Sequence, residues 1–292
     1  MPDNSPIVSP LIRQGFFALD RYSVLALDGA DAVAFAQAQF ASDLAALAPG
    51  QWQWSTWLNP KGRVIAVFAL LRSAETGLRL LLPDVDAAEL GDALRRLVFR
   101  RKLTVSPRPD LHLAGAFATP LAASGAQAAS IDGSEWELDA GAPALPRTLR
   151  LSPAPAPADA SAQEAWAVAD LRLGLPRLPA PQREQWTPQQ LGLERLRAFS
   201  VSKGCYPGQE IVARTHFLGK AKREALLLQV ADTVDAGHEV LQDGLGIGSI
   251  AAAAGRSPRL ALAVLPLQRG DGPLRAGGAD AIADAFVDGL AR

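Results

Sequence analysis

The sequence is poor in the residues that support disulfide and metal chemistry. Its 292 residues include one cysteine (Cys205), one methionine, three histidines and two tyrosines. A single cysteine excludes an intramolecular disulfide, and three scattered histidines form no zinc-type cluster, so we expect no metal site. Because disulfides mark oxidising compartments, this composition fits a reducing one, and we expect a cytoplasmic protein.

An excess of charge of one sign is also missing. The 29 basic and 30 acidic side chains leave a net charge of −1, so no whole-chain field attracts nucleic acid or acidic lipid. The opening MPDNSPIVSP has three prolines and no basic residue, so we expect no secretory leader. The charge-free stretch 111–131 is mostly Ala, Gly, Ser and Thr and predicts a core strand and a small-residue helix. We therefore expect neither a membrane partner nor a stable nucleic-acid partner.

Strand and helix patterns mix without regular alternation, which favours an α+β fold. Helical spacing follows Asp31, with apolar positions out to Leu47, and again follows Asp84; we expect both aspartates to cap helices. The proline- and alanine-rich stretch from Ser152 indicates an exposed connection, with structure resuming at Trp166. Runs typical of strands cover 16–27, 51–58, 63–72 and 78–82, with a turn at 59–62.

Three domains are expected. An N-terminal α+β lobe spans 1–110, a second α+β lobe spans 111–215, and short strands between glycine turns predict a C-terminal antiparallel β-barrel over 216–292. The second predicted helix ends in RRLVFRRK, which gathers Arg95, Arg96, Arg100, Arg101 and Lys102. Its simplest interpretation is a solvated face whose cations complement the helix dipole, with a phosphate or polyglutamate contact as the alternative.

The segment with most chemical information is KGCYPGQE, residues 203–210. Gly204 and Gly208 permit backbone conformations that a Cβ forbids, or let a ligand approach closely. The residues after Gly208 look helical, so Cys205 is predicted just before a helix N-terminus, with Lys203 two residues away. Both neighbours would stabilise a thiolate. The alternative to a reactive thiolate is that Cys205 is a small hydrophobic side chain buried in the core.

This segment resembles the K-G-C-Y-x-G-Q-E signature of the YgfZ-type folate-binding family, relatives of the glycine-cleavage aminomethyltransferases. The likeness covers roughly residues 20 to 255 and includes GADAVAFAQAQFASDL, NPKGR, WAVADLRLGLP, WTPQQ and IVARTHFLGKAKR. Three positions depart from the family pattern. Arg172 stands where Glu is usual, Gly192 stands where Asn is frequent, and Arg197-Ala198 replaces a Gly-Gly pair.

The resemblance implies an aminomethyltransferase-like fold of three lobes around a central channel that binds tetrahydrofolate or a one-carbon derivative. It implies an accessory factor for assembling or repairing iron–sulfur clusters, and so for enzymes such as tRNA methylthiolases. Its partners would be folate and the iron–sulfur machinery or its client proteins. Cys205 would be the functional thiol, facing a pteridine-sized cavity and supported by Lys203 and Tyr206. The folate-binding positions would be Tyr22, Trp166, Gly204, Gly208, Gln209, Glu210 and Arg214.

Two other functions remain open at this point. A true aminomethyltransferase needs a carboxylate directed at the folate, for which Asp43 and Asp170 are the nearest candidates. A cysteine-nucleophile enzyme needs a base near Cys205, and His216 lies eleven residues further along the chain.

Overall fold

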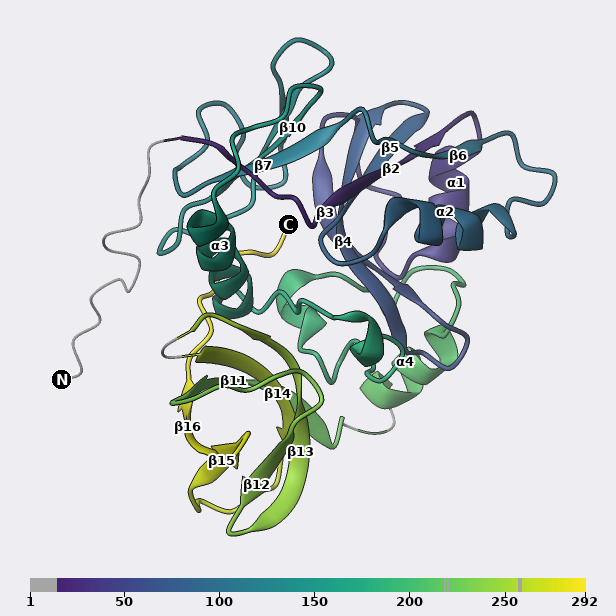
Figure 1. The fold of residues 1–292 in the computed structure, drawn as a ribbon. Helices are drawn as coiled ribbons and strands as arrows, with labels where there is room; N and C mark the ends of the chain where they lie inside the picture. Colours follow the sequence, from purple (N-terminus) through teal and green to yellow (C-terminus); the bar gives the residue numbers. More distant parts are fainter. Residues whose placement is uncertain (1–14, 218, 220, 257–258) are drawn as a thin grey trace.

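The structure is a computed structural model that describes residues 15–217, 219, 221–256 and 259–292. Its strands form two five-stranded antiparallel sheets and one closed barrel. In Figure 1 the barrel occupies one end of the molecule and both sheets the other, with α3 between them. The α+β prediction and the C-terminal antiparallel barrel are both confirmed.

The first sheet has the strand order β3-β4-β5-β2-β6 and packs against two helices. The predicted turn at Asn59–Gly62 joins β3 and β4, and the Asn59 amide donates to the Arg63 carbonyl oxygen at 2.9 Å. The elements of this layer are β2 (Ser23–Asp28), α1 (Ala32–Gln39), β3 (Trp52–Leu58), β4 (Val64–Ala74), β5 (Gly77–Leu82), α2 (Ala87–Arg95) and β6 (Thr104–Pro107).

The second sheet has the order β1-β7-β10-β9-β8 and is followed by mainly helical segments. Its elements are β1 (Phe17–Ala18), β7 (His112–Ala116), β8 (Ala129–Ser130), β9 (Trp136–Asp139) and β10 (Thr148–Ser152). The helical segments are α3 (Ala160–Arg172), η1 (Ala180–Gln182), η2 (Leu193–Leu196) and α4 (Gln209–Phe217).

The barrel closes in the order β11-β14-β13-β12-β15-β16. Closure pairs every strand on both sides, which leaves no free sheet edge. Its strands are β11 (Arg223–Val230), β12 (Glu239–Gln242), β13 (Leu245–Ala254), β14 (Arg259–Pro266), β15 (Leu274–Ala276) and β16 (Ala279–Asp284).

Several predicted boundaries are wrong near the N-terminal end. The run 16–27 is two strands in different sheets, because a turn closed by the Tyr22 amide and the Leu19 carbonyl redirects the chain. The helix after Asp31 ends at Gln39 rather than near Leu47, since Phe40 is extended. Leu47 is nevertheless buried in the core against which α1 packs. Burial, not helical continuity, explains the apolar spacing.

The two predicted helix caps have different outcomes. Asp31 occupies the N-cap position of α1 as predicted, but its carboxylate accepts from the Lys102 amide and makes no capping hydrogen bond. Helix α2 is capped by Asp86, whose side chain accepts from the Ala88 and Glu89 amides, while Asp84 binds an arginine described below.

The stretch 111–131 contains strands β7 and β8 but not the predicted helix. Pro120 lacks a backbone N–H for helical hydrogen bonding, and Gly125 has a left-handed φ of +55°, so neither continues a helix through this stretch. The connection after Ser152 is shorter than predicted, because α3 already begins at Ala160. No helix among the described residues is long and apolar enough to cross a membrane.

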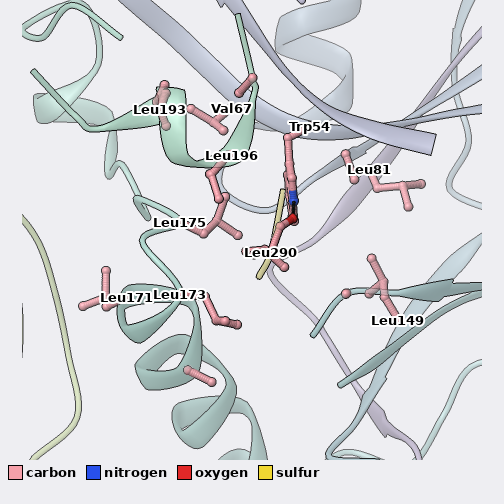
Figure 2. Packing of buried hydrophobic residues seen from close by; sticks show 14 of the residues in the cluster. Trp54, Val67, Leu81, Leu149, Leu171, Leu173, Leu175, Leu193, Leu196 and Leu290 are labelled. Atoms are coloured by element: carbon pink, nitrogen blue, oxygen red, sulfur yellow. Dashed lines mark hydrogen bonds between the residues drawn. The ribbon is translucent and has the colours of Figure 1, made fainter. Parts of the chain in front are cut away.

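One hydrophobic core joins the two sheets, the helical segments and the barrel. Figure 2 shows Trp54 of the first sheet, Leu149 of the second, Leu196 of η2 and Leu290 near the C-terminal end converging on it. The Trp54 indole N–H donates to the Leu290 carbonyl at 3.1 Å.

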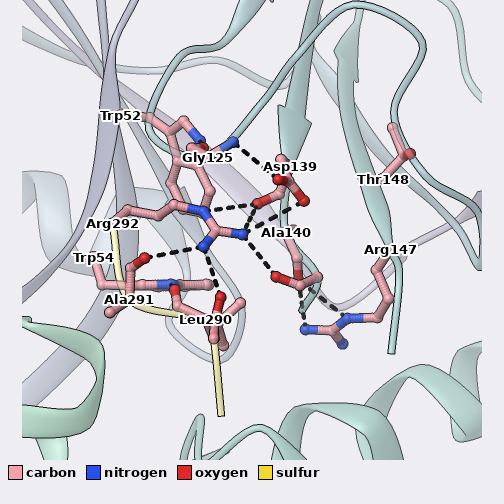
Figure 3. A network of polar contacts seen from close by, with 12 residues as sticks. Trp52, Trp54, Gly125, Asp139, Ala140, Arg147, Thr148, Leu290, Ala291 and Arg292 are labelled. Carbon is pink, nitrogen blue, oxygen red and sulfur yellow. Dashed lines mark hydrogen bonds and ion pairs between the residues drawn. The ribbon is translucent and has the colours of Figure 1, made fainter. Parts of the chain in front are cut away.

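Residue Arg292 ties the last segment to both sheets. Its guanidinium donates to the Asp139 carbonyl oxygen at the end of β9 and lies 5.5 Å from the Trp52 ring centroid (Figure 3). The final residues therefore cross between the sheets.

Candidate functional site

The 203–210 loop is held in place by the Lys203 ammonium. Its Nζ lies 2.6–2.7 Å from the carbonyl oxygens of Gln37, Phe40 and Ser42, at and after the C-terminal end of α1. Helix α1 has no basic residue in its last turn, so this distant lysine supplies the cation that complements its negative end. Burial lowers the pKa of Lys203 to about 8, against the opposing effect of Asp43.

This geometry gives Lys203 a structural role, whereas its predicted effect on the thiol stays a prediction. An ammonium has three N–H donors, and three carbonyl oxygens accept from them. Lys203 therefore anchors the loop and does not donate to Cys205. The reason is that the end of α1 offers a ready set of carbonyl acceptors.

The rest of the loop is braced by its own residues. The Gln209 amide donates to the Lys203 carbonyl at 3.0 Å, and the Tyr206 hydroxyl donates to the Ser200 carbonyl at 2.7 Å. Burial raises the pKa of Tyr206 to about 12. Gln209 and Tyr206 thus hold the loop, while Glu210 and Arg214 pair with each other on the exposed face of α4.

Of the two predicted special glycines, only Gly208 is required by the backbone. Its φ is +78°, and a Cβ there would lie 2.6 Å from the Asn59 carbonyl oxygen and 2.6 Å from the Gly62 Cα. The NPKGR turn and the KGCYPGQE segment therefore pack directly on each other. Gly204 has open space around it, so its small size leaves room beside Cys205.

The Cys205 side chain is exposed, which excludes the alternative of a small buried hydrophobe. It precedes α4 by four residues, as the sequence predicted. His216 packs edge-to-face on Phe217, with ring centroids 4.8 Å apart. In the part of the chain that the structure describes, no hydrogen bond joins His216 to Cys205, which does not support the cysteine–histidine alternative.

A cavity of about 880 Å³ lies between the first sheet, α3 and the barrel. Its walls include flat apolar side chains, three arginines and several carboxylates. The wall includes Leu19, Arg21, Tyr22, Pro83, Asp84, Gln163, Trp166, Arg177, Pro179 and Arg259.

The KGCYPGQE loop does not line this cavity. Neither Cys205 nor any other residue of 203–214 is part of its described wall. The structure therefore does not place the thiol in the wall of this cavity. Lys203 and Gly208 fix the loop against α1 and the β3–β4 turn instead.

Tyr22 and Trp166 are brought together in the cavity wall. The Trp166 indole N–H donates to the Tyr22 hydroxyl oxygen at 3.2 Å. Trp166 is only 1% exposed and packs against Phe17 and Phe117, so most of its ring belongs to the core. Tyr22 is half-buried and presents more surface. Burial, with the Asp170 carboxylate, raises the pKa of Tyr22.

A buried chain of alternating charges supports this wall. Arg177 Nε lies 2.8 Å from Asp84 Oδ1, and Arg177 Nη1 lies 2.8 Å from Asp170 Oδ2. The other Asp170 oxygen lies 2.7 Å from Arg147 Nη1. Burial alone would lower the pKa of Arg177, but the carboxylates of Asp84 and Asp170 raise it above its usual value. Burial raises the pKa of Asp84.

Neither Arg177 nor Asp84 is among the site residues predicted from the sequence. The available signal was a single charge inside an apolar stretch, as in LGLPRLP and LLLPDV. Such a charge is buried only with a partner. Asp170 uses both oxygens in ion pairs, and Asp43 accepts from Gln37 and the Ala45 amide. Unlike Asp84, neither residue is part of the described cavity wall.

The three departures from the family pattern have structural consequences. Arg172 lies 3.3 Å from Asp284 of the barrel and is not part of the described cavity wall. Gly192 and Arg197 flank η2 with left-handed φ values of +67° and +53°. Glycine accepts that conformation freely, whereas Arg197 adopts it at a steric cost.

Comparisons with known proteins agree with this architecture. A scan against models of known families finds no match. An uncharacterized protein of Haemophilus influenzae is 30% identical over 219 residues, covering 74% of this chain and 73% of the relative. A tRNA-modifying protein YgfZ of Cronobacter sakazakii is 27% identical over 242 residues, covering 76% and 73%. Its namesake in Yersinia pseudotuberculosis is 28% identical over 265 residues, covering 82% and 79%.

A solved structure shares the fold. The glycine cleavage system aminomethyltransferase T from Bartonella henselae superposes with a TM-score of 0.74, over 94% of this chain and 85% of that one. At 16% identity this match establishes the fold alone.

Proposed function

Because the chain belongs to the YgfZ-type family, which is related to the aminomethyltransferases of glycine cleavage, we propose that it binds a tetrahydrofolate in the cavity between the first sheet, α3 and the barrel. We further propose that it is a cytoplasmic accessory factor for iron–sulfur proteins, including those that modify tRNA. Folate and the iron–sulfur machinery or its clients would be its partners.

The observation that carries the folate proposal is the composition of the cavity wall. Its volume of about 880 Å³ is in the range that holds cofactor-sized ligands. Tyr22 and the prolines Pro83 and Pro179 supply flat surfaces for a pteridine or aminobenzoyl ring. Gln163 supplies an amide for the ring's hydrogen-bonding edge, and the Asp84–Arg177 pair adds polar groups to the same wall. The exposed Arg21 adds a cation for a carboxylate.

Titration with tetrahydrofolate, followed by tryptophan fluorescence, tests the folate site. We expect saturable micromolar binding that Tyr22→Leu weakens about 2- to 12-fold, since aromatic stacking contributes about 0.5–1.5 kcal/mol beyond burial. Phe99→Leu is the matched control, because Phe99 is exposed outside the cavity and its loss should not change the affinity. Absence of saturable binding by the folded protein would overturn this part of the proposal.

The thiol proposal concerns a second surface. The Cys205 side chain is exposed on a rigidly held loop, where a soft sulfur ligand can reach iron or sulfur carried by another protein. We expect Cys205→Ala to abolish function in a strain that lacks the wild-type protein, while its fold and folate affinity stay unchanged. Full complementation by this variant would refute the role of the thiol without affecting the folate proposal.

One observation favours a second candidate function, a folate-dependent aminomethyltransferase. Asp84 places a carboxyl group in the cavity wall, which the nearest candidates from the sequence, Asp43 and Asp170, do not. Turnover in a lipoyl-protein-dependent assay for methylene-tetrahydrofolate, lost in Asp84→Asn, would establish this function in place of the accessory role.

A further inference from the structure

We propose that the loop of residues 96–102, between α2 and β6, is a binding surface for RNA. This segment stands at the outer edge of the molecule, away from α3 and the barrel (Figure 1). It carries four exposed cations, Arg96, Arg100, Arg101 and Lys102. Within the described residues none of the four is ion-paired with a carboxylate, whereas the adjacent Arg95 is paired with Asp92. This is a locally positive surface on a chain whose net charge is −1, although the Asp31 carboxylate binds the Lys102 amide at one end of the segment.

An aromatic ring lies among these cations. Phe99 is 77% exposed, although its neighbour Val98 packs against the core of the first sheet. The Arg100 guanidinium lies 4.9 Å from the Phe99 ring centroid, and Arg100 adopts a left-handed φ of +54°. Val98 therefore anchors the loop, and Phe99 is left with ring surface on which a base can stack.

The loop is held in this conformation before any partner binds. The Val98 amide donates to the Arg95 carbonyl, and the Arg101 amide donates to the Val98 carbonyl. The Lys102 amide donates to the Asp31 carboxylate at 2.6 Å, and the Asp31 amide donates to the Lys102 carbonyl at 3.2 Å. Pre-ordering lowers the entropic cost of binding at this surface.

The combination of an exposed ring and cations without ion pairs is the chemistry that recognises single-stranded nucleic acid, and RNA is the form that fits the proposed function, on which this choice rests. Cations bind the phosphates, and the ring stacks on an unpaired base. Helix-dipole complementation does not explain the segment, because only Arg95 lies in the last turn of α2. The sequence suggested no stable nucleic-acid partner, and the exposure of Phe99 changes that conclusion. A membrane surface is a poorer fit, since Phe99 and Leu97 offer little apolar area.

Fluorescence anisotropy with a labelled single-stranded RNA 12-mer and an unmodified tRNA transcript tests the proposal. If the 12-mer contacts all four cations, we expect its binding to weaken about 50-fold between 50 and 200 mM salt. Replacing Arg100 and Arg101 together by Ala should cut this salt effect to about sevenfold and weaken binding at low salt. Phe99→Ala should weaken binding about tenfold and leave the salt dependence unchanged.

A matched control is the double replacement of Arg256 and Arg275 by Ala, which removes the same charge from exposed positions elsewhere. Equal loss of RNA binding in both double variants would overturn the proposal, because it would then reflect net charge alone. Absence of RNA binding at 50 mM salt would also overturn it, as would binding to phosphatidylglycerol vesicles but not to RNA. Folate titration of the same variants should be unaffected, since the loop lies outside the described cavity wall.

Discussion

Asp170 is the residue at which a single-atom change should destabilise this fold most. Its carboxylate is fully buried and lies between two guanidinium groups, 2.7 Å from Arg147 and 2.8 Å from Arg177. Asp170→Asn keeps the shape but removes the negative charge and places an amide N–H₂ against one arginine. Breaking a buried ion pair from one side costs about 3–5 kcal/mol, because it leaves a buried charge uncompensated. For a protein of 292 residues that corresponds to a Tm lower by roughly 5–8 °C.

The matched control is Asp288→Asn. Its carboxylate also pairs with an arginine, Arg195, at 2.9 Å, but is 89% exposed. Exposed pairs contribute only about 0–1 kcal/mol, so this variant should be nearly neutral. Thermal and urea unfolding followed by circular dichroism measures both. Equal stability of the two variants would refute the reasoning, because burial is what distinguishes their ion pairs.

The remaining predictions concern ionisation, backbone conformation and the thiol. Tyr22 and Tyr206 are the only tyrosines in the chain, and burial raises the pKa of both. In a fast alkaline titration at pH 11, we expect about 10% of Tyr206 to be ionised in the native protein, against about 90% in the urea-unfolded chain. Because the folded state keeps these protons while the unfolded chain loses them, stability should fall with rising pH from about 10 to 12; native ionisation near pH 10 would contradict this. Arg197→Gly should relieve left-handed strain and raise stability by up to about 1 kcal/mol, whereas Arg214→Gly within α4 should lower it by about 1 kcal/mol; a loss in both would contradict the argument. Iodoacetamide should alkylate Cys205 at the same rate with and without tetrahydrofolate, and protection by folate would show that thiol and cavity are not separate.

Local sequence patterns were sufficient to predict the fold class, the barrel and most strands of the first sheet. The β3–β4 hairpin could be predicted from the sequence because the Asn59–Gly62 turn and the apolar runs beside it are local signals. The division of residues 16–27 between two sheets could not be predicted, since β1 and β2 are both apolar and differ only in the strands with which they pair. The length of α1 was overestimated for a similar reason: Leu47 is buried by tertiary packing, not by a helix face.

The candidate site was predicted in its parts but not in its arrangement. The placement of Cys205 just before a helix follows from its own segment, whereas its exposure and the hydrogen bond between Trp166 and Tyr22 are seen only in the structure. The positions of the other site residues depend on partners that are distant in the sequence. The acceptors of Lys203 are some 160 residues away, and nothing in its own segment indicates them. Asp84 and Arg177 are likewise joined only by the fold.

The separation of thiol and cavity constrains how the two could act together. Both are attached to the first sheet: Tyr22 and Asp84 lie at the ends of β2 and β5, while the Cys205 loop packs on the β3–β4 turn through Gly208. No described residue belongs to both, so a folate bound in this cavity, as proposed, would not touch the sulfur. Any influence of folate on the thiol must then pass through movement of the sheet or of α1. The Lys203 anchor resists such movement, because leaving three carbonyl oxygens and a buried ammonium unpaired is costly. The proposed thiol role and the proposed folate site therefore call for separate tests, because the exposed thiol and the cavity wall share no described residue.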